Sequence, residues 1–419
     1  MGSPGVRTSL EQESMIKVLA QEAPLTIATY AARVEETDRF TDASDRTTKL
    51  SFGFFGEIGG LLAALKKVNR DRLLQTETEV AGEEIGDSVW YLIAMANAHR
   101  LGPQAVGIAS LTWLRKRFAE AEREVDGDVD FRQIDGLIAI HGRTLVRDRV
   151  ELLGELARVG AEVVGRAATA QLELETPSQT DLLGRLLALL GLVAASFMLK
   201  LEDIARDNVS KTHGRWPGTN PIYHSVLDAT FPAHERLPRA FRIEFIERTT
   251  PRGTFVVQRL NDVYVGDPLT DNRNEPDDYR FHDVFHLAYI AHLGWSPVVR
   301  ALLKLKRKSS SKVDENEDGA RAMIIEEGIA TWIFNHASHR DLYAGVAHGR
   351  LDYGLLKQVQ GMVRGYEVAA CPLWQWERAI LDGFRVFREL KKPEHRGGTV
   401  VVDMNKHTLE FVPLSKAET

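Results

Sequence analysis

The spacing of apolar residues changes once along the chain, between Pro217 and Pro238, and this change most constrains the fold. Before it, apolar residues recur three and four positions apart, as in Phe54, Ile58 and Leu61, which is the spacing of one face of an α-helix. After it, runs such as RIEFIERTT alternate residue by residue, as expected of β-strands. The sequence therefore predicts a mainly α protein with an all-α N-terminal half, a helical bundle, and an α+β C-terminal half.

Two β-hairpins are predicted in the C-terminal half. The first joins RIEFIERTT to TFVVQRLNDVYVG through a turn at Pro251 to Gly253, and the second is the final run TVVVDMNKHTLEFVPL. Helices are expected between them, from Asp278 to about Lys391. Within this region the segment 304–319 is charged and rich in Ser, and we interpret it as a solvated loop.

Composition excludes several classes of protein. The 419 residues predict two or three domains. Lys and Arg number 53 against 59 for Asp and Glu, so the basic excess of most nucleic-acid-binding surfaces is missing. No run reaches the roughly 18 uninterrupted apolar residues of a membrane span. A single cysteine, Cys371, cannot form an internal disulfide. The sequence therefore predicts a cytoplasmic protein that binds neither nucleic acid nor a membrane.

The N-terminal half contains an internal repeat at a constant offset of 98 residues. The offset aligns three pairs without a gap: Gly56 with Gly154, Gly86 with Gly184, and Arg117 with Arg215. Chance matches between Leu- and Ala-rich helices explain apolar identities, but a constant offset across two glycine positions and an Arg-aromatic end is harder to explain in this way. We interpret the repeat as a duplication, with copies at about 45–118 and 143–216.

Acidic residues gather in the first copy. Glu57 belongs to one predicted helix, and Glu83, Glu84 and Asp87 belong to the next. Glu84 and Asp87 are three positions apart, so they share a helix face, and antiparallel packing of the two helices would bring all four acids together. Clustered carboxylates suit Mg²⁺ or Mn²⁺. Acids on an amphipathic helix also commonly face water, and this alternative stays open.

Three motifs in this half carry a family resemblance. They are GEIGG from Gly56, EEIGD from Glu83, and NVSKTHGRWP from Asn208 to Pro217. With them the sequence resembles the MazG-type, all-α nucleoside triphosphate pyrophosphohydrolases over about residues 45–217. The resemblance implies metal-dependent hydrolysis of a (d)NTP to a (d)NMP and pyrophosphate, with Mg²⁺ or Mn²⁺ as cofactor. Nucleotide-pool control and anti-phage defence are roles compatible with that activity.

The resemblance also implies roles for six side chains, and the chemistry suggests a seventh. The resemblance implies that the metal is held by three acids, Glu57, Glu84 and Asp87. The neighbouring Glu83 is a spare carboxylate that we predict to accept the proton of the attacking water in catalysis. The resemblance further implies that the phosphates or the nucleotide are bound by Asn208, Lys211 and Arg215.

This chain departs from the family pattern in two ways. Gly60 stands where the family has the second Glu of its first motif, so one expected ligand is missing, and the candidates to replace it are Glu77, Glu79 and Glu83. The tail motif also lies about a hundred residues later than in a compact family member. Unless one of those three acids replaces the missing ligand, metal affinity or activity is expected to be lower.

The repeat explains the late tail motif. The first copy has Ser110 and Trp113 at the positions of Asn208 and Lys211, and the second copy has Leu182 and Arg185 opposite Glu84 and Asp87. The two copies therefore have complementary losses. Since family members act as dimers of such helix pairs, we hypothesise a fused pseudo-dimer with one composite site, and we leave assembly into a homo-oligomer open.

A second group of candidate ligands lies in the C-terminal half. His282 and His286 are one helical turn apart with Asp283 between them, and Glu326 and Glu327 belong to a later predicted helix. The layout is similar to that of zinc peptidases, which implies His282, His286 and Glu327 as Zn²⁺ ligands. The His-Asp pair is also similar to the dyad of HD phosphohydrolases. Histidines that are hydrogen-bonded in a core are the third interpretation.

The sequence thus predicts four segments: an N-terminal helical extension (1–44), a MazG-like helical domain (45–217), a linker (218–240) and an α+β domain (241–419). The first predicted function is nucleotide pyrophosphohydrolase. The alternative is a metal-dependent peptidase or phosphohydrolase centred on His282, His286 and Glu327, with the N-terminal half as a nucleotide-sensing or assembly module. A non-catalytic interaction protein is the third.

Overall fold

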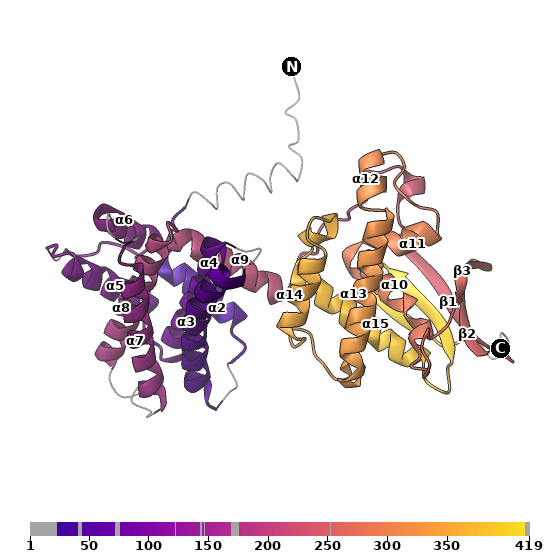
Figure 1. The fold of residues 1–419 in the computed structure, drawn as a ribbon, viewed down its shortest axis with the longest axis horizontal. Helices are drawn as coiled ribbons and strands as arrows, with labels where there is room; N and C mark the ends of the chain where they lie inside the picture. The colour runs from indigo at the N-terminus through magenta and orange to yellow at the C-terminus, as the bar shows by residue number, and fades with distance from the viewer. Residues whose placement is uncertain are drawn as a thin grey trace, which may run out of the picture. The chain divides into compact units, whose positions relative to one another are not determined.

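The computed structural model describes residues 23–40, 44–71, 76–121, 123–142, 145, 147–168, 176–251 and 253–414. The chain forms two compact units, Met1–His213 and Gly214–Thr419, whose elements are drawn in Figure 1. Of the predicted N-terminal extension, residues 1–22 and 41–43 lie outside the described residues, as does Arg252 in the first predicted hairpin. The described part of the extension contains helix α2 (Ile27–Thr37).

The regular elements described in the N-terminal unit are helices, as the apolar spacing predicts. Besides α2 they are α3 (Arg46–Asp71), α4 (Glu77–Ala98), α5 (Pro103–Arg117), α6 (Phe131–His141), α7 (Arg149–Ala168), α8 (Thr176–Ser196) and α9 (Leu201–Arg215). Helix α3 packs against α4 and α7, and α8 packs against α5 and α7. Phe54, Ile58 and Leu61 of α3 are all buried in one apolar core.

The helix bounds repeat at the offset found in the sequence. Helices α4 and α8 end 98 residues apart, and α5 and α9 begin and end 98 residues apart. The turns that precede α5 and α9 contain a left-handed residue at the equivalent position, Arg100 (φ 55°) and Met198 (φ 60°). In both turns the next backbone amide donates to the carbonyl five residues earlier. These correspondences are the ones that a duplication would produce.

Two glycines at equivalent positions let helices of different copies approach closely. A Cβ atom on Gly86 in α4 would lie 3.3 Å from the Cβ of Asn208 in α9, and one on Gly184 in α8 would lie 2.5 Å from the Cβ of Ala109 in α5. The third helix of each copy therefore packs on the second helix of the other copy. This exchange brings side chains of the second copy to the acids of the first.

One described segment, Ser178–Ser196 in α8, has the length and apolar composition of a membrane span. Of the window that passes this test, 72% is buried inside the structure. Since core helices of helical bundles also pass such a test, the segment is weak support for a membrane span.

The C-terminal unit contains a five-stranded antiparallel sheet in the order β3-β2-β1-β4-β5. The strands are β1 (Ala240–Thr250), β2 (Gly253–Leu260), β3 (Val263–Leu269), β4 (Gly397–Asp403) and β5 (Thr408–Val412). Both predicted hairpins are confirmed, and β1 pairs with β4 to join them. The run TFVVQRLNDVYVG contains one turn more than predicted, because Asn261 and Asp262 are both left-handed (φ 49° and 62°), as in a tight hairpin turn.

Helices cover this sheet and place the second candidate site. They are α10 (Asp283–Leu293), α11 (Pro297–Leu302), α12 (Ser311–Asn316), α13 (Ala320–Ser338), α14 (Tyr353–Met362) and α15 (Leu373–Leu390), with short 3₁₀ helices η3 (Ala233–Glu235), η4 (Tyr279–Phe281), η5 (Asp341–Tyr343) and η6 (Glu367–Ala370). Helix α10 is buried along its whole length and contacts α15, β4 and β5 (Figure 1). Each of its residues is buried, as expected of a core helix.

The charged segment 304–319 is not simply a solvated loop, so that interpretation is wrong. It contains helix α12, and both Arg307 and Asp318 are fully buried. Arg307 Nη2 lies 2.7 Å from Asp318 Oδ1 and 2.6 Å from Glu367 Oε1. The charges of this segment therefore include an ion-pair network in the interior of the C-terminal unit.

Candidate functional site

The start of α4 fixes where its acids lie. Thr76 caps the helix by accepting a hydrogen bond from the Glu79 amide, and the Glu79 carboxylate accepts one of 2.7 Å from the Thr76 amide, which is a capping box. Glu77 Oε2 lies 3.5 Å from Arg149 Nη1. All three candidates to replace the ligand missing at position 60 therefore make other interactions, since the third, Glu83, accepts a hydrogen bond from Lys211.

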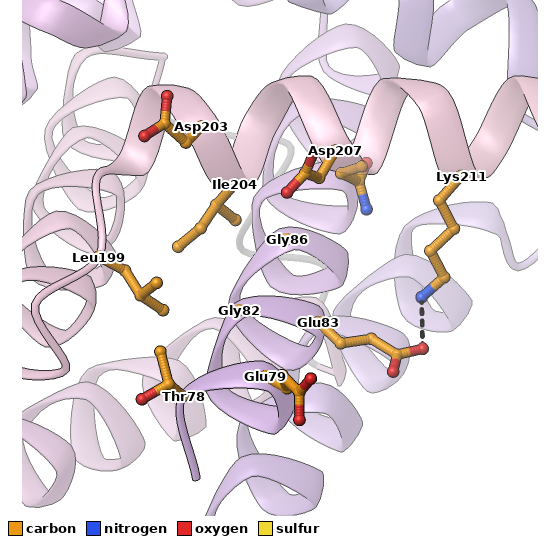
Figure 2. A pocket seen from close by; sticks show the side chains of 11 residues that line it. Thr78, Glu79, Gly82, Glu83, Gly86, Leu199, Asp203, Ile204, Asp207 and Lys211 are labelled. Carbon is orange, nitrogen blue, oxygen red and sulfur yellow. Dashed lines mark hydrogen bonds and ion pairs between the residues drawn. The ribbon is translucent and has the colours of Figure 1, made fainter. Parts of the chain in front are cut away.

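Side chains from α9 meet the acids of α4. Lys211 Nζ donates to Glu83 Oε1 at 3.0 Å and to Asp87 Oδ2 at 2.6 Å, and Asn208 Nδ2 donates to Asp87 Oδ1 at 2.9 Å. Figure 2 shows Lys211 extending from α9 to Glu83 on α4. The structure thus brings together the acids of the first copy and the tail motif of the second, which the sequence predicts for a composite site.

The carboxylates of α3 and α4 crowd one another. Burial raises the pKa of Glu57 to about 8, and the charges of Asp87 and Glu84 add to this effect. Burial also raises the pKa of Glu84, although a hydrogen bond with Glu57 opposes it. These acids therefore lie where an added cation lowers the electrostatic free energy. Since the donors are all oxygens, they fit Mg²⁺ or Mn²⁺.

Gly60 shapes the position of Glu84. A Cβ atom at Gly60 would lie only 2.4 Å from Glu84 Oε2, so the Glu84 carboxylate occupies the space that a side chain at position 60 would take. The residue that departs from the family pattern thus makes room for another acid of the same cluster.

Tyr30 orients the amide of Asn208. Its hydroxyl donates to Asn208 Oδ1 at 2.9 Å, and this leaves Asn208 Nδ2 to face Asp87. Tyr30 is fully buried on α2. We did not predict this residue from the sequence. The apolar spacing of Ile27, Tyr30 and Val34 indicates that α2 packs, but it carries no signal for the partner of a hydroxyl.

A cavity of about 440 Å³ adjoins the acids. Glu83, Asn208 and Lys211 belong to its wall, and Asp203 and Asp207 line it from α9 (Figure 2). Burial and the charge of Asp203 raise the pKa of Asp207. Glu83 and Lys211 both line the cavity, and Lys211 also contacts Asp87. A ligand in the cavity can therefore reach the acids.

In the second copy, two arginines neutralise Glu155, the residue equivalent to Glu57. Glu155 accepts hydrogen bonds of 2.8 Å from Arg117 and 2.9 Å from Arg185. Arg185 stands at the position equivalent to Asp87, and both guanidinium groups lie within 6 Å of the centre of the Trp113 ring. The second copy therefore offers a paired carboxylate where the first copy offers a cluster of acids.

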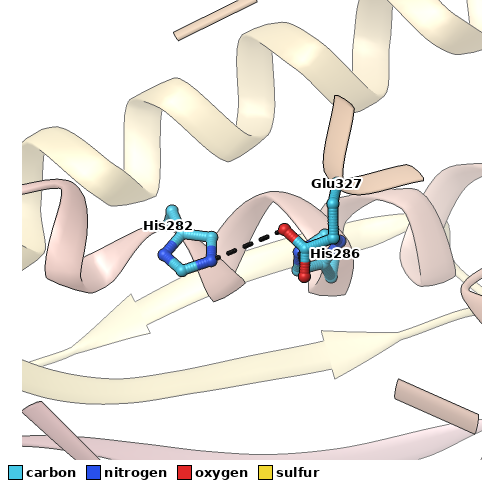
Figure 3. Close-up of side chains that lie close together, drawn as sticks. All are labelled: His282, His286 and Glu327. Atoms are coloured by element: carbon cyan, nitrogen blue, oxygen red, sulfur yellow. Dashed lines mark ion pairs between the residues drawn. The ribbon is translucent and has the colours of Figure 1, made fainter. Parts of the chain in front are cut away.

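The three candidate metal ligands of the C-terminal unit lie close together. Among the described residues, one group of three metal-ligating side chains has its donor atoms within 4.8 Å of one another, namely His282, His286 and Glu327 (Figure 3). The four acids of the N-terminal unit do not form such a group among these residues. Burial lowers the pKa of His286, but Glu326 and Glu327 together raise it well above its usual value. The carboxylates therefore favour a positive charge at this place, either a proton or a metal ion.

A family model matches the region of the chain that contains these three side chains. Residues 222–415 match the model of the MazG C-terminal domain. Over this region the chain is therefore similar to the MazG C-terminal domain. The match covers none of residues 45–217, which carry the family resemblance seen in the sequence. It does include the candidate zinc ligands His282, His286 and Glu327. Neither the curated proteins nor the solved structures that were compared include a match to the chain.

Arg215, the last of the predicted substrate-binding residues, forms a buried ion pair with Glu377. Both Arg215 and Glu377 have side chains that are 2% exposed, and Arg215 Nη1 lies 2.7 Å from Glu377 Oε2. Arg215 Nη2 also donates to the Leu351 carbonyl at 2.7 Å, while Glu377 accepts from the amides of Gly349 and Leu351. The structure thus places Arg215 in the interior of the C-terminal unit, and its substrate-binding role stays a prediction.

Proposed function

We propose that this MazG-related chain is a metal-dependent nucleotide pyrophosphohydrolase that converts a (d)NTP to a (d)NMP and pyrophosphate. One observation carries the proposal: Asn208 and Lys211 of the second copy contact Asp87 of the first, as a composite site requires. The match to the MazG C-terminal domain supports a MazG-related hydrolase. A single cysteine and a net charge of −6 are compatible with action on small nucleotides in the cytoplasm.

Three acids are proposed to hold the cation: Glu57, Glu84 and Asp87. Their all-oxygen donor set and the raised pKa of Glu57 support this assignment, because a divalent ion relieves the crowding of carboxylates. When bound, Mg²⁺ neutralises phosphate oxygens and lowers the pKa of the attacking water.

The chain's own side chains would perform the remaining tasks. Water attacks the α-phosphorus, the bond from this phosphorus to the bridging oxygen breaks, and pyrophosphate leaves with that oxygen. Lys211 exchanges its contacts with Glu83 and Asp87 for the phosphate oxygens, and Glu83 is then available to accept the proton of the attacking water. The adjoining cavity lies within the size range of small-ligand sites and has room for part of the nucleoside.

Replacement of Lys211 by Gln is expected to lower kcat/KM for pyrophosphate release by about 10- to 100-fold, which corresponds to one charge-assisted hydrogen bond. Steady-state kinetics with each NTP and dNTP in Mg²⁺ measures this effect. Lys116→Gln is the control, since Lys116 is exposed on α5. Equal kcat/KM for Lys211→Gln and the wild type would contradict the proposed phosphate contact.

Replacement of Gly60 by Ala is expected to lower activity without lowering stability. The added Cβ displaces the Glu84 carboxylate, which can move because it ends a flexible side chain, while Ala at a helix position gains up to about 1 kcal/mol over Gly. Gly59→Ala is the matched control, because a Cβ there meets no atom within 4 Å. Pyrophosphate release and denaturant unfolding are measured for both. Wild-type activity in both variants would contradict the role of Glu84.

A second candidate function is a metal-dependent peptidase or phosphohydrolase centred on His282, with the N-terminal unit as a nucleotide sensor or assembly module. The convergence of His282, His286 and Glu327 favours it. Mg²⁺-dependent pyrophosphate release that requires Glu84 would support the first candidate. Hydrolysis of a peptide or phosphoester that requires His286, without such release, would support the second.

A further inference from the structure

We propose that the C-terminal unit binds one Zn²⁺ ion through His282 Nε2, His286 Nε2 and the Glu327 carboxylate. This inference goes beyond the proposed pyrophosphohydrolase function, which uses side chains of the N-terminal unit. Each proposal can therefore fail without the other.

Hydrogen bonds hold both imidazole rings in the orientation that a metal requires. His282 Nδ1 lies 2.9 Å from the Tyr279 carbonyl, and His286 Nδ1 lies 2.8 Å from Glu326 Oε1. Nδ1–H is the donor in each bond, so Nε2 carries the lone pair that binds metal. Glu326 is itself fixed, because its other oxygen accepts a 2.8 Å hydrogen bond from the Val298 amide. Such a carboxylate–histidine pair is the usual support of a zinc ligand.

The distances between donor atoms are close to those around one zinc ion. Glu327 Oε1 lies 3.5 Å from His286 Nε2, and Glu327 Oε2 lies 3.8 Å from His282 Nε2. Zinc bonds of roughly 2.0–2.1 Å in a tetrahedron place ligand atoms about 3.3 Å apart. All three donor atoms lie within 4.8 Å of one another, so the site must contract when it takes up one ion.

The Nε2 atom of His286 also lacks a hydrogen bond. It is fully buried, and no hydrogen-bond partner for it exists in the part of the chain that the structure describes. Buried polar atoms without a partner are rare and call for an explanation such as an ion. The Nε2 atom lies 3.5 Å from Glu327 Oε1, and a metal bound between these two atoms would give the buried nitrogen a partner.

The residues around the three ligands and the exposure of Glu327 indicate which metal the site suits. Tyr279 stacks on the His282 ring, with centroids 4.3 Å apart and planes at 3°. The Glu327 side chain is 42% exposed, so the ion can exchange with solvent. Two imidazoles and one carboxylate suit zinc better than Mg²⁺, and three protein ligands leave a fourth position for water. Gln258 donates to one oxygen of the neighbouring Asp283. The other Asp283 oxygen lies 3.2 Å from His282 Nε2, so a metal bound at that nitrogen would replace this ion pair.

The test measures zinc bound to the full chain. Metal-stripped protein is incubated with Zn²⁺ in excess Mg²⁺, which competes for the all-oxygen site, and bound metal is then measured by mass spectrometry after gel filtration. The wild type is expected to retain one zinc per chain, and Glu327→Gln and His286→Ala are expected to lose it. Since His286 is buried, the partly exposed Glu327 provides the variant that leaves the core intact. His339→Ala, an exposed histidine at the end of the same helix α13, is the control and should retain zinc.

A second measurement separates ligand from supporting residue. Glu326→Gln is expected to weaken zinc binding by about 10- to 100-fold in chelator competition. Glu84→Gln should retain full zinc even where pyrophosphate release is lost, so failure of one proposal is distinguishable from failure of the other. The zinc proposal is overturned if the wild type retains none, or if Glu327→Gln retains as much as His339→Ala.

Discussion

Glu57→Gln and Glu84→Gln are each expected to lower Mg²⁺-dependent pyrophosphate release by at least about 10²- to 10³-fold, the usual loss when one preorganised electrostatic contact in a catalytic site is removed. Each substitution keeps the shape of the side chain and removes a carboxyl group that can ionise to bind the cation. Both residues pack with Asp87, whose charge already raises their pKa values. Pyrophosphate release from each NTP and dNTP is the measurement.

The internal repeat provides the matched control. Glu155 occupies the position in the second copy that Glu57 has in the first, but it is paired with Arg117 and Arg185. Glu155→Gln is therefore expected to leave pyrophosphate release near the wild-type rate. If Glu84→Gln released pyrophosphate at the wild-type rate, or if Glu155→Gln lost as much as Glu57→Gln, the composite site in the first copy would be wrong.

The largest effect on stability is expected from Glu377→Gln. This change leaves the buried Arg215 guanidinium without its counter-ion, and breaking a buried pair by removing one partner costs about 3–5 kcal/mol. Glu377 also accepts from two backbone amides, so a neutral amide side chain disrupts several bonds at once. The free energy of unfolding from denaturant titration measures the loss.

Arg350→Ala is the control for this prediction, because Arg350 is exposed in the same unit. Its effect is expected to stay within about 0.5 kcal/mol. If Glu377→Gln unfolded with the same free energy as the wild type, Arg215 would be available for the substrate contact that the sequence predicts, and its structural role would be wrong.

Local patterns predicted most of the fold. Apolar residues three and four apart predicted the N-terminal helices, and alternation predicted both hairpins. The additional turn at Asn261 and Asp262 was missed because the residues on either side of it alternate in one continuous run, and the pair lacks the glycine that usually signals such a turn. The spacing of apolar residues thus predicts helices and strands well, but it does not reveal a turn that interrupts an alternating run.

The candidate site was predictable only where sequence motifs carry it. The constant offset led to the pairing of the acids of the first copy with Asn208 and Lys211. The partners of Tyr30 and Arg215 lie 178 and 162 residues away along the chain, and no local pattern encodes contacts at such separations. The same limit explains the charged segment 304–319, whose Arg307 pairs with Glu367, 60 residues later.

The arrangement of two copies within one chain has a consequence for how the site can change. In a dimer of identical subunits, any substitution appears in both subunits. A substitution that stabilises one site therefore also changes the second, symmetry-related site. A chain that carries both copies is free of that coupling. Arg117 and Arg185 can hold Glu155 in ion pairs while Asp87 stays in contact with Asn208 and Lys211, so the two copies can diverge in sequence independently.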